Sequence, residues 1–166
     1  MKIYLIRHSN AVDPGTPGYE DDSARPLTEK GHEKMRRIAS ALKTLGVVPD
    51  LIVSSPYLRA RETAEILAKE LKYRSELAFS DALAPMGDAD RIIGEINEKY
   101  SVDELVLVGH EPCFSVLVGT LIAAAPGIEM DLKKGGACCL SADNLKVERK
   151  AVLEWLLTPK LLTRLE

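Results

Sequence analysis

Two histidines and two arginines lie where the side chains of a parallel sheet usually meet a ligand. Arg7 and His8 follow the first apolar run of the chain, and Arg59 and His110 follow two later ones. Open α/β sheets bind ligands beyond the carboxyl ends of their strands. Arginine forks match phosphoryl oxygens, and a histidine nitrogen can act as a nucleophile or an acid/base. The residue types therefore predict a site for a dianionic phosphoryl group.

The elements that must position these side chains alternate along the chain. The patterns predict strands over 2–7, 51–55, 75–79 and 104–110, with late strands over 136–142 and 147–156. They predict helices over 29–45, 56–72, 88–99 and 112–124, with a long loop over 9–27. Strands that alternate with helices indicate an α/β fold. We expect a three-layer α/β/α sandwich with a mostly parallel central sheet, and a single domain over 1–166.

Four of these elements carry specific expectations. Thr28 is the predicted N-cap of the first helix, and Gly46 is predicted to end it. Its buried face is expected to carry Met35, Ile38, Leu42 and Leu45. Pro56 and Pro112 are expected to open two later helices. The last strand is expected to place Val147, Ala151, Leu153 and Trp155 on one side.

Composition excludes several classes of protein. Lys and Arg minus Asp and Glu is 22 − 25 = −3, which argues against a general nucleic-acid binder. The apolar part of the N-terminus ends at Arg7, too early for a signal peptide, and no apolar run is long enough to span a membrane. Three cysteines without C-x-x-C spacing indicate packed thiols. We expect a cytoplasmic protein that binds neither nucleic acid nor membrane.

Four segments in order resemble the histidine phosphatase superfamily, the phosphoglycerate mutase-like family. Arg7-His8-Ser9 resembles its R-H-G signature, and residues 27–31 (LTEKG) resemble its L-T-x-x-G element. Residues 54–64 (SSPYLRARETA) are similar to its S-x-x-x-R-A-x-x-T-A element, and residues 108–112 (VGHEP) match its second-histidine element. The resemblance implies a phosphoglycerate mutase-like fold and phosphatase activity. Ser9 departs from the pattern, because the family has glycine there.

The small size of the chain and Arg25-Pro26-Leu27-Thr28 look most like the SixA-type phosphohistidine phosphatases. Larger branches carry a Glu or Asp acid after the third strand. The corresponding stretch, 80–88, is short here and has Ala84 where a glutamate is expected. A phosphoramidate leaves as an imidazole, which needs less help from an acid than an alkoxide does. The resemblance therefore implies phosphohistidine on a signalling or phosphotransfer protein as the substrate.

The implied mechanism has two steps and no cofactor. His8 attacks phosphorus to form a covalent phosphohistidine, and water then hydrolyses it. Arg7 and Arg59 hold the equatorial oxygens, and His110 adds a further donor. Because the arginines neutralise the charge, no metal is required.

Other interpretations of these residues stay open. Arg7 and the histidines could be ordinary strand-end or cap residues, and Arg59 could pair with Glu62 or Glu65 on its own helix. A phosphatase for small esters or phosphopeptides would need a proton donor. The candidates are Asp13, Asp81, Asp88 and Glu111, each of which could instead be a cap or surface residue. A non-catalytic module that recognises phosphate is a further alternative, since Ser9 departs from the family pattern.

Overall fold

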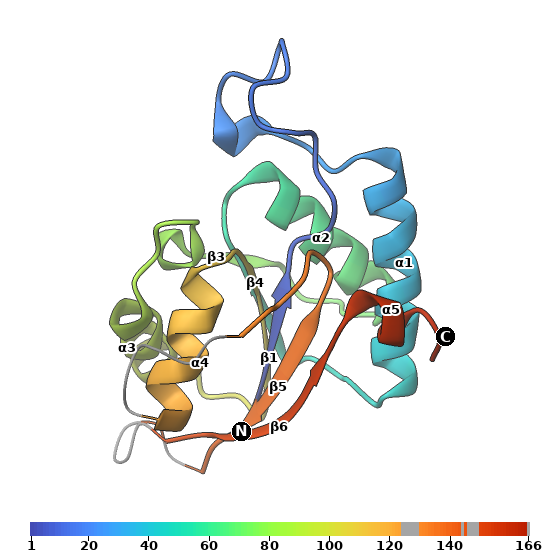
Figure 1. Ribbon diagram of the computed structural model, residues 1–166. Helices are drawn as coiled ribbons and strands as arrows, with labels where there is room; N and C mark the ends of the chain where they lie inside the picture. The colour runs from blue at the N-terminus through green and yellow to red at the C-terminus, as the bar shows by residue number, and fades with distance from the viewer. Residues whose placement is uncertain (124–129, 144, 146–149, 166) are drawn as a thin grey trace.

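The computed structural model describes residues 1–123, 130–143, 145 and 150–165 (Figure 1). The described residues form six strands: β1 (Lys2–Arg7), β2 (Leu51–Ser54), β3 (Ala78–Phe79), β4 (Glu104–Gly109), β5 (Ala137–Ser141) and β6 (Val152–Leu157). The α-helices among them are α1 (Glu29–Thr44), α2 (Leu58–Glu70), α3 (Ala89–Lys99), α4 (Cys113–Ala123) and α5 (Pro159–Leu162). Two short 3₁₀ helices, η1 (Asp22–Ala24) and η2 (Asp81–Leu83), lie in loops.

The six strands form one sheet in the order β3-β2-β4-β1-β5-β6. The first four run parallel to their neighbours, and β5 and β6 are antiparallel additions at one side. In the register of the sheet, Arg7 lies beside Gly109 and Ser54 lies beside Val108. The ends of β1, β2 and β4 therefore meet at one edge, and the residues that follow them are brought together there.

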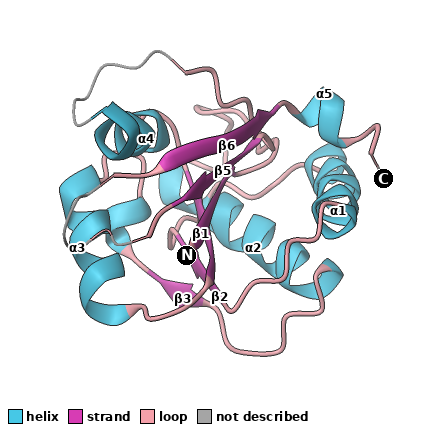
Figure 2. Cartoon of the chain, turned by 90° about the horizontal axis from the view of Figure 1, so that it is seen from below, coloured by secondary structure: helices cyan, strands magenta, loops and turns pink. Residues whose placement is uncertain are grey.

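Helices cover both faces of this sheet. In β1, Ile3 and Leu5 pack into the core under α3 and α4, whereas Tyr4 and Ile6 pack into the core under α1 and α2. The alternation follows from the two-residue period of a strand. Figures 1 and 2 show α3 and α4 on one side of the sheet and α1, α2 and α5 on the other. The expected three-layer α/β/α fold with a mostly parallel sheet is confirmed.

The start of α1 is tied to the segment that follows His8. Thr28 caps α1 by accepting a hydrogen bond from the Gly31 backbone N–H (3.0 Å), as predicted. The Thr28 backbone N–H also donates to the Asn10 carbonyl (2.9 Å). A Cβ atom on Gly31 would lie 2.0 Å from that same carbonyl oxygen. Glycine at 31 therefore lets the chain beyond His8 pass directly against the helix.

Several element predictions were wrong in detail. Leu45 was expected on the buried face of its helix, but it is the C-cap residue and 42% exposed. The prolines do not open their helices, because α2 begins at Leu58 and α4 at Cys113. The third strand is shorter than 75–79. The four-residue α5 and the two 3₁₀ helices were not predicted at all.

The one-sided pattern expected for the last strand was also wrong. The register of β5 against β6 shifts between Cys139 and Leu140, whose partners are Trp155 and Leu153. A bulge of this kind inserts one residue and moves the alternation to the other face. Leu153 is consequently 42% exposed, while Trp155 packs against Tyr4 with ring centroids 6.0 Å apart. Residues 147–149 of the predicted strand lie outside the described residues.

None of the helices in the described part of the chain is long and apolar enough to cross a membrane.

Candidate active site

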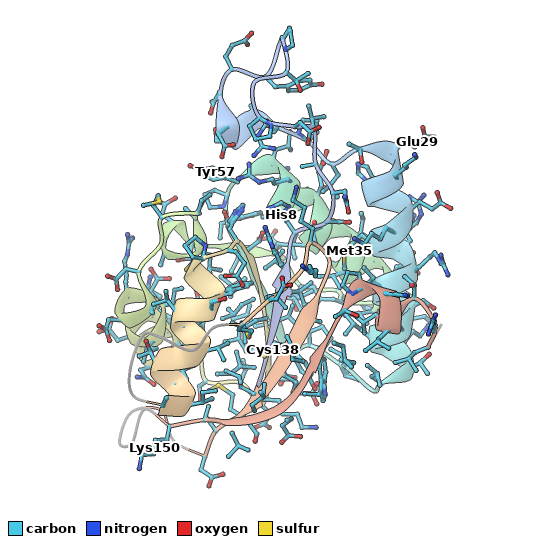
Figure 3. The ribbon with its side chains drawn as sticks, in the orientation of Figure 1. His8, Glu29, Met35, Tyr57, Cys138 and Lys150 are labelled. Carbon is cyan, nitrogen blue, oxygen red and sulfur yellow. The ribbon has the colours of Figure 1, made fainter. Side chains whose placement is uncertain are left out.

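The carboxyl edge of the sheet gathers all four residues singled out from the sequence. Arg7 ends β1 and His8 follows it, His110 follows β4, and Arg59 lies in the first turn of α2. The rings of His8 and His110 have centroids 4.9 Å apart. Figure 3 shows His8 and Tyr57 at the end of the sheet that faces the loop carrying η1. The structure thus brings together side chains that are up to 103 positions apart in the sequence, since 110 − 7 = 103.

His8 is held with one ring nitrogen facing the site. It is 6% exposed, and its Nδ1 lies 2.7 Å from the backbone carbonyl of Ser9. Because a carbonyl only accepts, Nδ1 carries the proton in this contact. Nε2 accepts a hydrogen bond from Arg59 Nε (3.3 Å), which places the lone pair on that nitrogen. Burial lowers the pKa of His8 to about 3, against the backbone bond to Ser9. The ring is therefore neutral at physiological pH, with its lone pair on Nε2.

Ser9 fits the site without distorting the backbone. Its Oγ donates to the Gly31 carbonyl (2.9 Å), and its backbone N–H donates to Thr63 Oγ1 (3.2 Å). The residue is fully buried. Its φ is not in the left-handed region, where Lys72 is the one non-glycine residue among those described. The departure from the family's glycine is accommodated by the neighbouring helix, and the hydroxyl is directed to Gly31.

The two arginines are engaged in different ways. Arg7 Nη1 donates to the Leu132 carbonyl (2.8 Å), while its Nε is buried without a partner. Arg59 is 4% exposed and donates from Nη1 to the Asp22 carbonyl (2.7 Å) and from Nη2 to Asp22 Oδ2 (2.9 Å). Its guanidinium is thus fixed beside His8.

The alternative pairing of Arg59 within its own helix does not occur. Glu65 instead accepts from Arg61 Nε (2.8 Å), and Glu62 accepts from the Leu27 backbone N–H (2.6 Å). Arg59 is consequently turned toward the site.

His110 presents a second unpaired donor. Its Nε2 lies 2.9 Å from Ser55 Oγ, whose hydroxyl already accepts from the Tyr57 backbone N–H (3.3 Å). Among the hydrogen bonds of the described residues, Nε2 is the one acceptor available to the Ser55 hydroxyl proton. With that proton directed to Nε2, the ring proton sits on Nδ1, which is buried without a partner. Burial lowers the pKa of His110 to about 2, and the positive charge of Arg59 acts in the same direction.

The unpaired hydrogen-bond donors indicate which kind of ligand the site binds. An unsatisfied buried polar atom costs about 1–3 kcal/mol, so it is retained where a ligand pairs with it. Arg7 Nε and His110 Nδ1 are two such atoms. The His110 ring lies beside that of His8, and the charges of Arg7 and Arg59 act on both rings to lower their pKa, an arrangement that suits an anion with several oxygens. The described residues contain no group of three or more His, Cys, Asp or Glu side chains that could hold a metal ion.

The carboxylates considered as proton donors lie elsewhere or are otherwise engaged. Asp13 and Asp81 are exposed, and Asp88 caps α3 by accepting from the Arg91 backbone N–H (2.8 Å). Glu111 accepts from the Ser115 hydroxyl through Oε2 (2.7 Å), while its Oε1 is buried without a partner. Ala84, at the position where a glutamate was expected, is the C-cap of η2. None of these residues has a recorded contact with His8.

Sequence reasoning missed the carboxylate that does reach the site, Asp22. It lies in the loop over 9–27, where no hydrophobic period positions a side chain. Its spacing to Arg25 is the one signal that could have found it, because the two residues form an ion pair across the turn of η1.

The buried histidines make the fold sensitive to acid. An unfolded histidine titrates near pH 6.5, above the lowered pKa values of His8 and His110. Between these values the unfolded chain binds protons that the folded chain does not. The free energy of unfolding is therefore expected to fall as the pH drops below about 6.5, by up to about 1.4 kcal/mol per pH unit for each histidine.

Denaturant unfolding of the protein and of His8→Gln between about pH 7 and pH 5 measures this effect. The variant should lose stability less steeply with acid, by about 1 kcal/mol per pH unit. His32→Gln, which removes a partly exposed histidine of α1, sets the reference slope. Parallel curves for all three proteins would contradict the prediction.

Comparisons with known proteins agree with this geometry. A model of the histidine phosphatase superfamily (branch 1) matches residues 3–86. The chain is 34% identical over 150 residues to an uncharacterized protein of Picosynechococcus sp., covering 89% of each. It is 30% identical over 125 residues to the phosphohistidine phosphatase SixA of Escherichia coli, covering 74% of this chain and 73% of that one.

The fold is also found in a solved structure of the protein histidine phosphatase SixA complexed with tungstate. The two superpose with a TM-score of 0.81 at 24% identity, covering 96% of this chain and 98% of that one. The phosphoglycerate mutase-like fold expected from the resemblance is confirmed. The matched residues include the first histidine element and the arginine of α2, and the chain belongs to the histidine phosphatase superfamily.

Proposed function

We propose that this protein hydrolyses phosphohistidine on a signalling or phosphotransfer protein through a covalent phospho-His8 intermediate. The observation that carries the proposal is the Nε2 atom of His8. It is unprotonated, and it lies against the guanidinium of Arg59 at a sheet edge where Arg7 and His110 each keep a donor unpaired. The name of the Escherichia coli relative, a phosphohistidine phosphatase, supports this substrate.

In the first step, Nε2 of His8 attacks phosphorus in line, and the bond from phosphorus to the leaving nitrogen breaks. The electron pair of that bond stays on the leaving imidazole. Nδ1 keeps its proton and its hydrogen bond to the Ser9 carbonyl, which stabilises the positive charge that the ring acquires. Arg7, Arg59 and His110 hold the equatorial oxygens as charge develops on them.

In the second step, water attacks phosphorus and the bond to His8 breaks. His8 regains its lone pair, and both hydrogens of the water stay on the product, which leaves as dihydrogen phosphate. The arginines supply the charge neutralisation that a metal ion supplies in other phosphoryl-transfer enzymes, and the neutral His110 adds a hydrogen-bond donor. The proposal therefore includes independence from metal ions, and it places the activity in a single domain over 1–166 in the cytoplasm.

Phosphate release tests this proposal. The substrates are a phosphotransfer domain phosphorylated on histidine and a small phosphate monoester, each assayed with a chelator present. Release from phosphohistidine that resists the chelator supports the proposal. Preference for the monoester would replace it with a general phosphatase, and binding of phosphate without release from either substrate would replace it with a recognition module.

A further inference from the structure

Asp22 contacts the end of the Arg59 guanidinium, while His8 contacts its Nε atom. Arg59 donates from Nε to His8 Nε2 (3.3 Å) and from Nη2 to Asp22 Oδ2 (2.9 Å). One guanidinium thus joins the candidate nucleophile to a carboxylate. The effect of Asp22 also reaches His110, since its negative charge acts to raise the pKa of that ring against burial. Asp22 is therefore part of the same site.

A second arginine keeps this carboxylate in place. Arg25 is buried and donates from Nε (2.8 Å) and Nη2 (2.6 Å) to Asp22 Oδ1, while its Nη1 donates to the Val12 carbonyl. Partial burial acts to raise the pKa of Asp22, but the hydrogen bonds from Arg25 and Arg59 outweigh it and lower the pKa. At physiological pH the carboxylate is therefore ionised and has no proton to give.

The loop that carries Asp22 stands over the carboxyl edge of the sheet, above His8. In Figures 1 and 3, η1 and its loop rise beyond the carboxyl edge of the sheet, with His8 beneath them. In-line attack by His8 leaves the departing group on the far side of phosphorus, away from Nε2. We place the departing group toward η1, the segment that stands beyond this edge of the sheet. Asp22 is half exposed there, so an incoming group can contact it.

We propose that Asp22 is a specificity-determining residue that selects a phosphorylated imidazole over a phosphate ester by accepting a hydrogen bond from the leaving ring. The inference rests on the proposed function and assigns the part of the site that contacts the leaving group.

The chemistry balances without a proton transfer. Phosphohistidine can enter with phosphorus on one ring nitrogen and a proton on the other, so that the ring is cationic. Its N–H donates to the Asp22 carboxylate, a charge-assisted hydrogen bond. When the bond to phosphorus breaks, its electron pair stays on the ring, which leaves as neutral imidazole with the same N–H. The alkoxide that leaves from a phosphate ester of an alcohol, in contrast, needs a proton as it departs. The ionised Asp22 carboxylate cannot supply that proton.

The test compares two substrates on one variant. Asp22→Asn removes the charge with little change of shape, and Asp13→Asn removes a charge from an exposed residue of the same loop. The substrates are a phosphotransfer domain phosphorylated on histidine and p-nitrophenyl phosphate, whose leaving phenolate needs no proton. Asp22→Asn should lower kcat/KM for phosphohistidine by about tenfold to a hundredfold, the range for a hydrogen bond to a charged group. Any loss with p-nitrophenyl phosphate, which would come from a less firmly held Arg59, should be smaller, so that the ratio of the two kcat/KM values falls.

The ratio of the two rates separates specificity from structure, because a poorly folded or misplaced Arg59 would slow both substrates together. Equal losses in Asp22→Asn, or no loss, would overturn the inference while the proposed function stands. A wild-type protein that releases phosphate from the nitrophenyl ester and not from phosphohistidine would overturn both. Asp22→Ala, which removes the acceptor altogether, should change the ratio in the same direction, whereas Asp13→Asn should leave it at the wild-type value.

Discussion

Replacing His8 by glutamine is expected to remove phosphatase activity and the covalent intermediate together. The proposed reaction passes through a bond between phosphorus and Nε2, and no amide atom can replace that lone pair. Loss of a catalytic nucleophile costs on the order of 10⁴–10⁶ in kcat. The site should still bind phosphate, because Arg7, Arg59 and His110 keep their donors.

The chain contains three histidines, so a phosphoryl group found on the protein has few histidine side chains to which it can be assigned. Rapid quenching in alkali, where an N-phosphoryl group survives, followed by mass spectrometry should find one added phosphoryl group on His8. His110→Gln should be slower by about 10²–10³, as for loss of one charge-stabilising donor, yet still form phospho-His8. His32→Gln should match the wild type. An active His8→Gln protein would contradict the covalent route.

The gathering of His8, Arg59 and His110 could be predicted from the sequence because it depends on strong and regular signals. β1 and β4 are apolar runs whose ends are marked by the first polar residues, Arg7 and His110. In a parallel sheet such ends share one edge, so the convergence follows from topology alone. The roles proposed for these residues remain predictions.

Features that depend on a single local event could not be predicted. The bulge in β5 against β6 moves Leu153 to the other face, and no residue pattern in 147–156 marks it. The four residues of α5 are too few to show a helical period. Asp22 reaches Arg59 only because η1 turns the loop back over the sheet edge, and the contact is between residues 37 positions apart. Sequence spacing does not encode such a contact.

Replacing Arg59 by glutamine is expected to lower kcat/KM by about 10²–10³, the cost of one preorganised donor to the transition state. The guanidinium lies beside Nε2 of His8, so its charge acts where the phosphoryl oxygens gain charge. Asp22 keeps its hydrogen bonds from Arg25 in the variant, so the η1 loop should stay folded. The effect should therefore appear in catalysis and in inhibition by vanadate, and only weakly in the denaturation midpoint.

Arg61 provides the matched control, because it lies two positions further along α2. Its side chain is exposed and pairs with Glu65 on the same helix. Arg61→Gln loses the same charge from the same helix, yet should keep wild-type kcat/KM. Arg59→Lys separates charge from shape: a lysine keeps the charge and lacks the fork, so it should recover only part of the loss. If Arg59→Gln and Arg61→Gln had the same activity, Arg59 would have no part in binding the phosphoryl group, and its contacts with His8 and Asp22 would be structural.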